Sequence, residues 1–171
     1  MNIAVVGLGF VGLSISSVLA SKNYNVVGID IDNQKCSDIR NGVLPLFEPD
    51  LENTLRIGLK KKLTISNNFS LIKNCDMIFV AVGTPQKSNG AIELSMIKKA
   101  TATIGQIIRK SKKNPIIFIK STVIPGTAQN VILPILEKKS GKKQIEVLGS
   151  FQTQNFYKKV MQLEIQNIHI R

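Results

Sequence analysis

The sequence predicts an α/β fold in which a doubly wound, mostly parallel sheet of about six strands is flanked by helices. Short apolar runs alternate with helical segments over residues 1–150, which is the pattern of repeated βαβ units. The chain of 171 residues has the size of one domain. Hydrophobic residues make up 43% and aromatic residues only 5%, so aliphatic side chains must fill the core.

The first half of the chain carries clear signals for strand and helix boundaries. An apolar run that ends at Gly7 indicates a buried strand, and Asn41-Gly42 is typical of a helix end. Leu51, Leu55 and Leu59 recur every four residues and form one helical stripe. We expect strands at 2–7, 25–30 and 63–66, helices at 11–21, 33–40 and 50–61, and a loop at 43–49.

The second half continues the alternation as far as residue 148. The apolar stretch before Gly83 predicts a central strand, and Pro134 is expected to kink the last helix. Residues 151–171 show no clean period of 2 or 3.6 and do not continue the pattern. We expect strands at 77–82, 116–119 and 145–148, and helices at 94–110 and 127–139.

The charge balance is strongly basic, with 23 Lys and Arg against 11 Asp and Glu and a formal net charge of +12. The lysine clusters at 60–62, 109–113 and 138–143 fall at expected helix ends, where cations complement the helix dipole. They belong to three separate connections and lack interleaved aromatic residues for base stacking. Nucleic acid is therefore not the expected partner.

The sequence also argues against membrane and metal sites. No apolar run approaches the roughly 20 residues of a membrane helix, and the N-terminus lacks the basic region of a signal peptide. We expect a cytoplasmic protein. The two cysteines, Cys36 and Cys75, have no Cys-x-x-Cys or histidine partner, so they are predicted to be reduced thiols and no metal is expected.

One motif carries chemistry. Gly7, Gly9 and Gly12 form a G-x-G-x-x-G between the first strand and the first helix. In this context Gly7 permits a tight turn, Gly9 lets a pyrophosphate approach the backbone, and Gly12 allows close packing of helix on strand. The N–H groups and dipole at the start of the helix favour the same phosphate. The motif predicts a dinucleotide site on a Rossmann-type domain.

Asp30 sharpens this prediction. It lies 18 residues after Gly12, at the end of the second expected strand. A carboxylate there accepts hydrogen bonds from the adenosine ribose hydroxyls and repels a 2′-phosphate, which favours NAD over NADP. Lys35 weakens the preference slightly, because a nearby cation accepts a phosphate. The alternative is a glycine-rich turn in an unrelated α/β protein.

Two later loops follow expected strands, at 83–85 and 121–127. Cofactors in such folds bind outside the carboxyl ends of strands, and hydroxyl groups there can bond a ribose, an amide or a water. Taken alone, such residues are more often caps and turns.

Five segments in order make the chain resemble the UDP-glucose/GDP-mannose dehydrogenase family, and specifically its N-terminal NAD-binding domain. They cover residues 1–150 and little beyond them. Members of this family oxidise the C6 hydroxymethyl group of a nucleotide sugar to a carboxylate with two NAD, through a cysteine thioester. The matching segments are 7–13, 27–32, 47–51, 80–85 and 120–127.

The resemblance implies roles for individual residues. Asp30 and Lys35 would lie at the adenosine ribose. Thr84 and Thr122 would line the nicotinamide side, and Thr122 would also position a catalytic water. The residues that would cradle the pyrophosphate are Gly7, Gly9, Phe10, Val11 and Gly12.

Departures from the family limit what this chain is expected to do. The family's catalytic cysteine lies in a downstream loop that has no counterpart here, and Cys36 and Cys75 are in the wrong places to replace it. The substrate-side lysine, the central helix that forms the family homodimer and the sugar-nucleotide domain are also missing. We expect NAD binding without turnover.

Residues 151–171 depart from the family's pattern, and we expect them to come from a shifted reading frame of the gene. The family continues here with Asn-Pro-Glu-Phe-Leu. Degenerate codons for residues 151–162, read in a shifted frame, permit the run Ser-Asn-Pro-Glu-Phe-Leu-Gln-Glu-Gly. We expect a frameshifted tail, and the nucleotide sequence tests this; an unrelated divergent tail is the alternative.

The resemblance favours UDP-glucose as the family substrate, with the GDP-mannose branch as the alternative. Two other functions stay open. A non-catalytic remnant would retain only a cofactor-binding module. A hydroxyacid dehydrogenase of the 6-phosphogluconate type shares the glycine fingerprint, but the segments at 48–49 and 121–127 argue against it.

Overall fold

The computed structural model describes residues 1–44, 49–143 and 145–149. The first half contains β1 (Asn2–Val6), α1 (Phe10–Ser21), β2 (Asn25–Ile29), α2 (Asn33–Arg40), α3 (Pro49–Lys61) and β3 (Leu63–Ser66). The second half contains the 3-10 helix η1 (Phe69–Asn74), β4 (Met77–Val80), α4 (Ser95–Ile108), β5 (Ile116–Ile119), the π-helical turn η2 (Ala128–Ile132), α5 (Leu133–Ser140) and β6 (Val147–Leu148).

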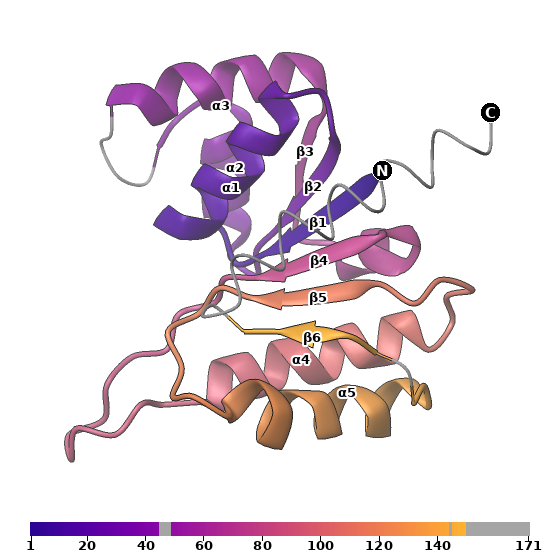
Figure 1. The fold of residues 1–171 in the computed structure, drawn as a ribbon. Coiled ribbons are helices and arrows are strands. Elements are labelled where there is room, and N and C mark those ends of the chain that lie inside the picture. Colours follow the sequence, from indigo (N-terminus) through magenta and orange to yellow (C-terminus); the bar gives the residue numbers. More distant parts are fainter. Residues whose placement is uncertain (45–48, 144, 150–171) are drawn as a thin grey trace.

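The strands form one six-stranded sheet in the order β3-β2-β1-β4-β5-β6 (Figure 1). Every strand pair of this sheet is parallel, so the described sheet is parallel throughout. The direction of winding reverses between β1 and β4, which is the arrangement of a Rossmann-type domain. The predicted fold class is confirmed.

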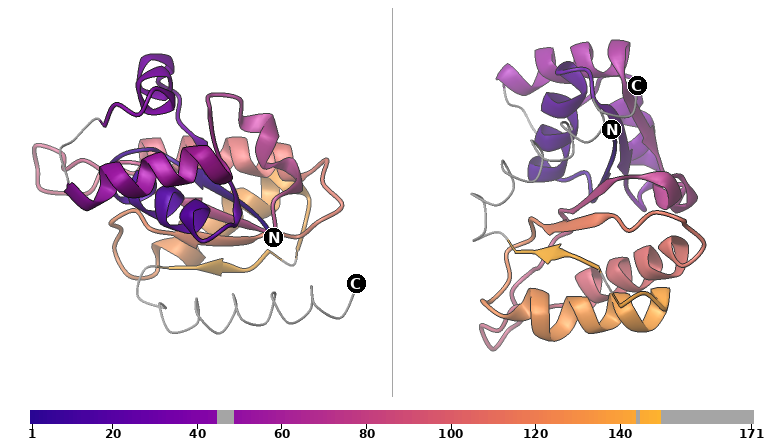
Figure 2. Two further views of the ribbon diagram at one scale, coloured as in Figure 1. Left: turned by 90° about the horizontal axis from the view of Figure 1, so that it is seen from above. Right: turned by 45° about the vertical axis from the view of Figure 1, so that its right-hand side comes forward.

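Helices cover both faces of the sheet. The right-hand view of Figure 2 shows α1, α2 and α3 on one side and α4 and α5 on the other. Successive side chains of a strand point to opposite faces. Ile3 and Val5 of β1 therefore pack in the core beneath α1–α3, while Ala4 and Val6 pack in the core beneath α4 and α5. Burial on both faces explains why the strands read as continuous apolar runs.

Most predicted elements occur where the sequence placed them. The bounds of α2, β3 and β5 agree with the predicted ranges, and Gly42 takes a φ of +80° after α2. The strand predicted at 77–82 stops at Val80, although the Ala81 N–H still donates to the Val6 carbonyl oxygen at 2.8 Å. The 3-10 helix η1 was not predicted from the sequence. The predicted tail at 151–171 lies outside the described residues.

The helix predicted at 127–139 is divided into η2 and α5. Pro134 lies in the first turn of α5, where the missing N–H and the fixed φ of proline are tolerated. The turn before it, η2, is π-helical. The disturbance expected near Pro134 therefore takes the form of a π-helical turn that leads directly into α5.

Small residues bring α1 and α3 close together. A Cβ on Gly58 would lie 3.3 Å from both the Ala20 Cβ and the Ser17 carbonyl oxygen. Ser16 and Ser17 are both fully buried on α1. The Ser16 hydroxyl donates to the Gly12 carbonyl at 2.7 Å, whereas the Ser17 hydroxyl has no hydrogen-bond partner among the described residues.

We predict that Ser17→Ala stabilises the protein by about 1 kcal/mol, because it removes a buried hydroxyl that has lost its bonds to water. Ser16→Ala is the matched control and should leave stability unchanged or lower it by about 1 kcal/mol, because its hydroxyl is satisfied. Urea denaturation followed by circular dichroism measures both. Destabilisation of Ser17→Ala equal to that of Ser16→Ala would show that Ser17 has a partner.

Candidate functional site

The site lies at the edge of the sheet where the strands end. Because the sheet is parallel, the loops after β1, β2, β4 and β5 all emerge at this edge. The glycine loop follows β1, beside the point where the strand order reverses. A crevice at such a reversal is where ligands bind in open α/β sheets.

Steric contacts explain two of the three glycines. Gly7 has a φ of +95°, and a Cβ there would lie 2.7 Å from the Ala81 carbonyl oxygen. A Cβ on Gly12 would lie 1.8 Å from the Gly7 carbonyl oxygen. Both positions therefore require glycine for the fold itself. Gly9 differs, since nothing lies within 4 Å of its added Cβ, and the space above it is open to a ligand.

The start of α1 can receive an anion. Gly9 is the N-cap residue, and within this described segment no side chain caps the helix and no acidic residue occupies its first turn. Phe10 and Val11 are 46% and 43% exposed. The first backbone N–H groups of a helix have no intrahelical acceptor and carry the positive end of the dipole. This geometry fits a phosphate group.

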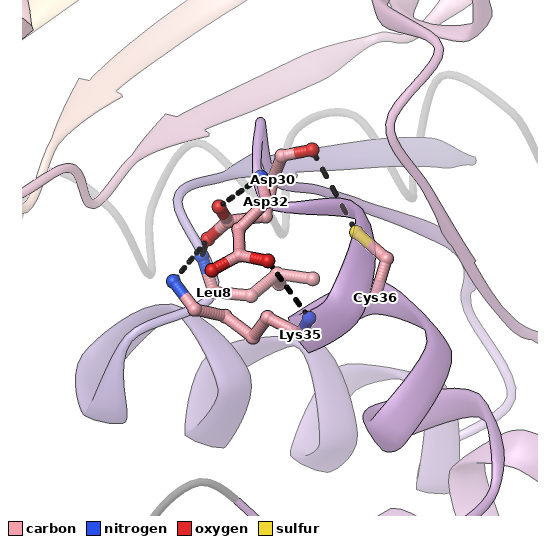
Figure 3. A network of polar contacts seen from close by, with 5 residues as sticks. All are labelled: Leu8, Asp30, Asp32, Lys35 and Cys36. Carbon is pink, nitrogen blue, oxygen red and sulfur yellow. Dashed lines mark hydrogen bonds and ion pairs between the residues drawn. The ribbon is translucent and has the colours of Figure 1, made fainter.

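Asp30 lies directly after β2 and organises the neighbouring loop (Figure 3). The side chain of Asp30 is only 8% exposed. Oδ2 accepts from the Leu8 backbone N–H at 2.8 Å and from Lys35 Nζ at 3.1 Å. Oδ1 accepts from the Asp32 backbone N–H at 3.1 Å. The carboxylate therefore fixes the glycine loop to the end of β2.

Helix α2 places Lys35 and Cys36 around this carboxylate. Asp32 caps α2 by accepting from the Lys35 backbone N–H at 3.0 Å. The Cys36 thiol donates to the Asp30 carbonyl oxygen at 3.6 Å. Burial raises the pKa of Cys36. The thiol therefore remains protonated and acts as a donor.

The structure brings Thr84 and Thr122 together, although they are 38 residues apart. The Thr84 hydroxyl donates to the Thr122 carbonyl oxygen at 2.7 Å. Beside them, the Ser121 hydroxyl donates to the Val82 carbonyl oxygen at 2.6 Å. The sequence reasoning did not select Ser121 as a site residue. The signals for it were its place in the loop at 121–127, just after a strand, and in the family-matching segment 120–127.

The second cysteine lies away from this edge. Cys75 follows η1 at the beginning of β4 and is buried. Burial and, to a lesser extent, the neighbouring Asp76 raise the pKa of its thiol to about 11. Neither Cys36 nor Cys75 has the lowered pKa of a nucleophilic cysteine.

The lysine clusters gather at the opposite edge, where the strands begin. The sequence analysis treated 109–113 and 138–143 as separate connections, but Lys142 joins them. Its ammonium group donates to the carbonyl oxygens of Ser111 and Lys113 and to Asn114 Oδ1, at 3.0, 2.6 and 2.8 Å. Several helices end at this edge, so their C-terminal dipoles attract cations there.

Neither a metal-binding cluster nor a membrane-spanning helix occurs among the described residues. The described residues hold no group of three His, Cys, Asp or Glu that could bind a metal ion. Within the same residues, no helix is long and apolar enough to cross a membrane.

Comparison with known proteins identifies the family of this domain. Residues 1–157 match the model of the UDP-glucose/GDP-mannose dehydrogenase family, NAD binding domain. The chain is 41% identical over 145 residues to a GDP-mannose 6-dehydrogenase of Pseudomonas syringae pv. tomato, covering 84% of this chain and 33% of that protein. It is 30% identical over 143 residues to a UDP-glucose 6-dehydrogenase of Haloferax volcanii, again covering 84% and 33%.

Solved structures agree. A ternary complex of GDP-mannose dehydrogenase from Pseudomonas aeruginosa superposes with a TM-score of 0.82 and 34% identity over 87% of this chain and 35% of that one. A UDP-glucose dehydrogenase from Pyrobaculum islandicum superposes with a TM-score of 0.79 and 27% sequence identity. The match covers 86% of this chain and 34% of that one. The chain thus spans about a third of the length of these relatives. The matched domain binds NAD.

We predict that Gly9→Ala lowers NAD affinity at least about tenfold, because its Cβ occupies the space through which the pyrophosphate approaches. Stability should change by less than about 1 kcal/mol, because that Cβ meets nothing in the protein. Isothermal titration calorimetry and thermal denaturation measure the two quantities.

Gly12→Ala is the control, because its main effect is expected on stability. Its Cβ would overlap the Gly7 carbonyl oxygen, so the free energy of unfolding should fall by about 3 kcal/mol or more. Unchanged NAD affinity in Gly9→Ala would place the pyrophosphate elsewhere.

Proposed function

This chain belongs to the UDP-glucose/GDP-mannose dehydrogenase family, and on that premise we propose that it is the NAD-binding part of a nucleotide-sugar 6-dehydrogenase. The observation that carries the proposal is the open space above Gly9, next to the uncapped start of α1. The buried carboxylate of Asp30 completes the arrangement at the same edge.

We infer that GDP-mannose is the favoured substrate of the complete enzyme. The sequence reasoning placed UDP-glucose first, and the higher identity to GDP-mannose 6-dehydrogenases, 41% against 30%, supports the other order. UDP-glucose is the second candidate, because a UDP-glucose dehydrogenase matches the fold nearly as well. Contacts to the base and the sugar are expected from parts of those enzymes that this chain does not match.

The contacts of Asp30 determine how it can meet the adenosine ribose. A carboxylate offers about four lone-pair positions, and Leu8, Asp32 and Lys35 occupy three of them. One ribose hydroxyl can bond Oδ1 without displacing any partner. A second hydroxyl requires the Lys35 ammonium to move, which is feasible because this side chain is 31% exposed. Lys35 then lies free to bond the same ribose.

The nicotinamide end is assigned to the loops that carry Thr84 and Thr122. NAD, when bound, supplies a hydride acceptor at this position. The Thr84 proton is already used in the bond to the Thr122 carbonyl, so toward a ligand Thr84 can only accept a hydrogen bond. Thr122 is exposed, and its hydroxyl is available to position a water.

Cysteine chemistry is not assigned to this chain. The family reaction requires a thiolate that captures an aldehyde. Cys36 and Cys75 are the only cysteines of the sequence, and burial raises the pKa of both thiols. The 171 residues are therefore proposed to bind NAD without turnover. A cofactor-binding module without catalysis is the second candidate function.

Asp30→Asn should reduce the preference for NAD over NADP by about tenfold or more. The amide keeps an acceptor for the Leu8 N–H, but it removes the charge that repels a 2′-phosphate. Titration of the full chain with each dinucleotide measures the ratio. A ratio that does not change would remove Asp30 from the ribose site.

The substrate assignment is tested with chimeric enzymes. Residues 1–149 replace the matching segment of the Pseudomonas aeruginosa GDP-mannose dehydrogenase, and a second chimera uses the Haloferax volcanii UDP-glucose 6-dehydrogenase. We expect GDP-mannose-dependent NADH formation in the first and weaker UDP-glucose oxidation in the second, because the interfaces of the first are more alike. The reverse order would make UDP-glucose the assigned substrate.

The unmodified chain is the control for both chimeras. It should release no NADH from either sugar nucleotide, as followed by absorbance, while still binding NAD. Turnover by this chain alone would contradict the assignment of the cysteine step to another part of the enzyme. Two inactive chimeras that bind NAD would favour the non-catalytic module.

A further inference from the structure

Two loops at the carboxyl edge are joined by a pair of reciprocal hydrogen bonds. The first loop follows β4 and contributes the Thr84 hydroxyl, which donates to the Thr122 carbonyl oxygen at 2.7 Å. The second loop follows β5 and contributes the Ser121 hydroxyl, which donates to the Val82 carbonyl oxygen at 2.6 Å. Each loop therefore contributes one hydroxyl donor and one carbonyl acceptor to the pair of bonds.

These bonds begin where the sheet ladder ends. β4 stops at Val80 and β5 at Ile119. The last backbone bonds between these segments run from Lys120 and Ser121 to the Val80 carbonyl, at 2.8 and 3.2 Å. Beyond this point, side-chain hydroxyl groups replace the backbone in setting the distance between the loops.

The Ser121–Val82 bond also reaches the glycine loop. The Ala81 N–H donates to the Val6 carbonyl at 2.8 Å. A Cβ on Gly7 would lie 2.7 Å from the Ala81 carbonyl oxygen and 2.9 Å from the Val82 nitrogen. The backbone that Ser121 holds therefore rests directly against the turn of the glycine loop.

Ser121 itself is inaccessible to a ligand. Its exposed fraction is 4%, and its hydroxyl faces the carbonyl oxygens of Val82 at 2.6 Å and of Val80 at 3.5 Å. The surface on the ligand side is formed instead by Gly83, Thr84 and Thr122. A Cβ on Gly83 would meet nothing within 4 Å, so open space lies above the loop that Ser121 fixes.

We propose that Ser121 is a positioning residue for the nicotinamide ring of NAD. It acts through Val82, by holding the loop of Thr84 at a fixed distance from the loop of Thr122, and does not touch the cofactor. The inference rests on the proposed function, because it requires the nicotinamide end to lie over these two loops. The adenosine half is expected near Gly9 and Asp30, where the bonds of the Ala81 N–H to Val6 and of the Leu8 N–H to Asp30 hold the glycine loop without the Ser121 hydroxyl.

The test compares NAD with ADP-ribose, which lacks the nicotinamide ring, using the full chain and isothermal titration calorimetry. The unaltered protein should bind NAD more tightly than ADP-ribose. Ser121→Ala should lower NAD affinity about fivefold to tenfold, the effect of one lost hydrogen bond, and leave ADP-ribose affinity within about twofold. Ser121→Thr keeps the hydroxyl and should restore much of the difference.

Ser140→Ala is the matched control. Ser140 is also 4% exposed, and its hydroxyl bonds the Lys142 backbone N–H at the opposite edge. Its loss should change neither affinity, which separates positioning from general destabilisation. If Ser121→Ala does not fold, Ser121→Cys gives the second measurement, because a thiol is only a weak donor to the Val82 carbonyl oxygen, and it should weaken NAD binding selectively.

The outcomes separate this inference from the proposed function. Equal weakening of NAD and ADP-ribose in Ser121→Ala, or no change in either, would overturn the positioning role. So would equal affinity of the two ligands for the unaltered chain. Failure of the unaltered chain to bind both ligands would instead overturn the proposed NAD site.

Discussion

The contact between the glycine loop and the end of β4 is the constraint on which the site depends. Gly7, Gly12 and the backbone at Ala81 approach so closely that a single methyl group at either glycine would overlap a carbonyl oxygen. This close approach lies between β1 and β4, the two neighbouring strands at which the strand order of the sheet reverses. It also leaves Gly9 exposed, with open space beside its Cα atom.

The second organising element is the buried carboxylate of Asp30. Burial of a charge is costly unless hydrogen bonds compensate it, and here two backbone N–H groups and an ammonium group do so. The same contacts hold the loop at Leu8 and the start of α2. Asp30 is thus both a structural anchor and the proposed ribose ligand, and its ligand role depends on the mobility of Lys35.

The parallel sheet also separates charge by edge. The helices that cover it end at the edge where the strands begin, and their dipoles favour the lysines that follow them. The helix starts, with their unsatisfied N–H groups, are at the edge of the proposed cofactor site. A basic protein therefore presents its lysine clusters on the side away from the proposed NAD site.

The sequence by itself determined the fold class, most strand and helix positions and the glycine motif, because these depend on local period, turn residues and a fixed spacing. It also identified Thr84 and Thr122 as candidates, through the family resemblance. Only the tertiary structure decided that Ser121 joins the loops after β4 and β5, and that the Lys35 ammonium group bonds the Asp30 carboxylate. The same is true of the bonds by which Lys142 links the lysine clusters at 109–113 and 138–143. These contacts join residues distant in sequence or depend on side-chain direction, and no local pattern encodes either. The π-helical turn before Pro134 belongs to the same group, because how a helix adapts to proline depends on what packs against it.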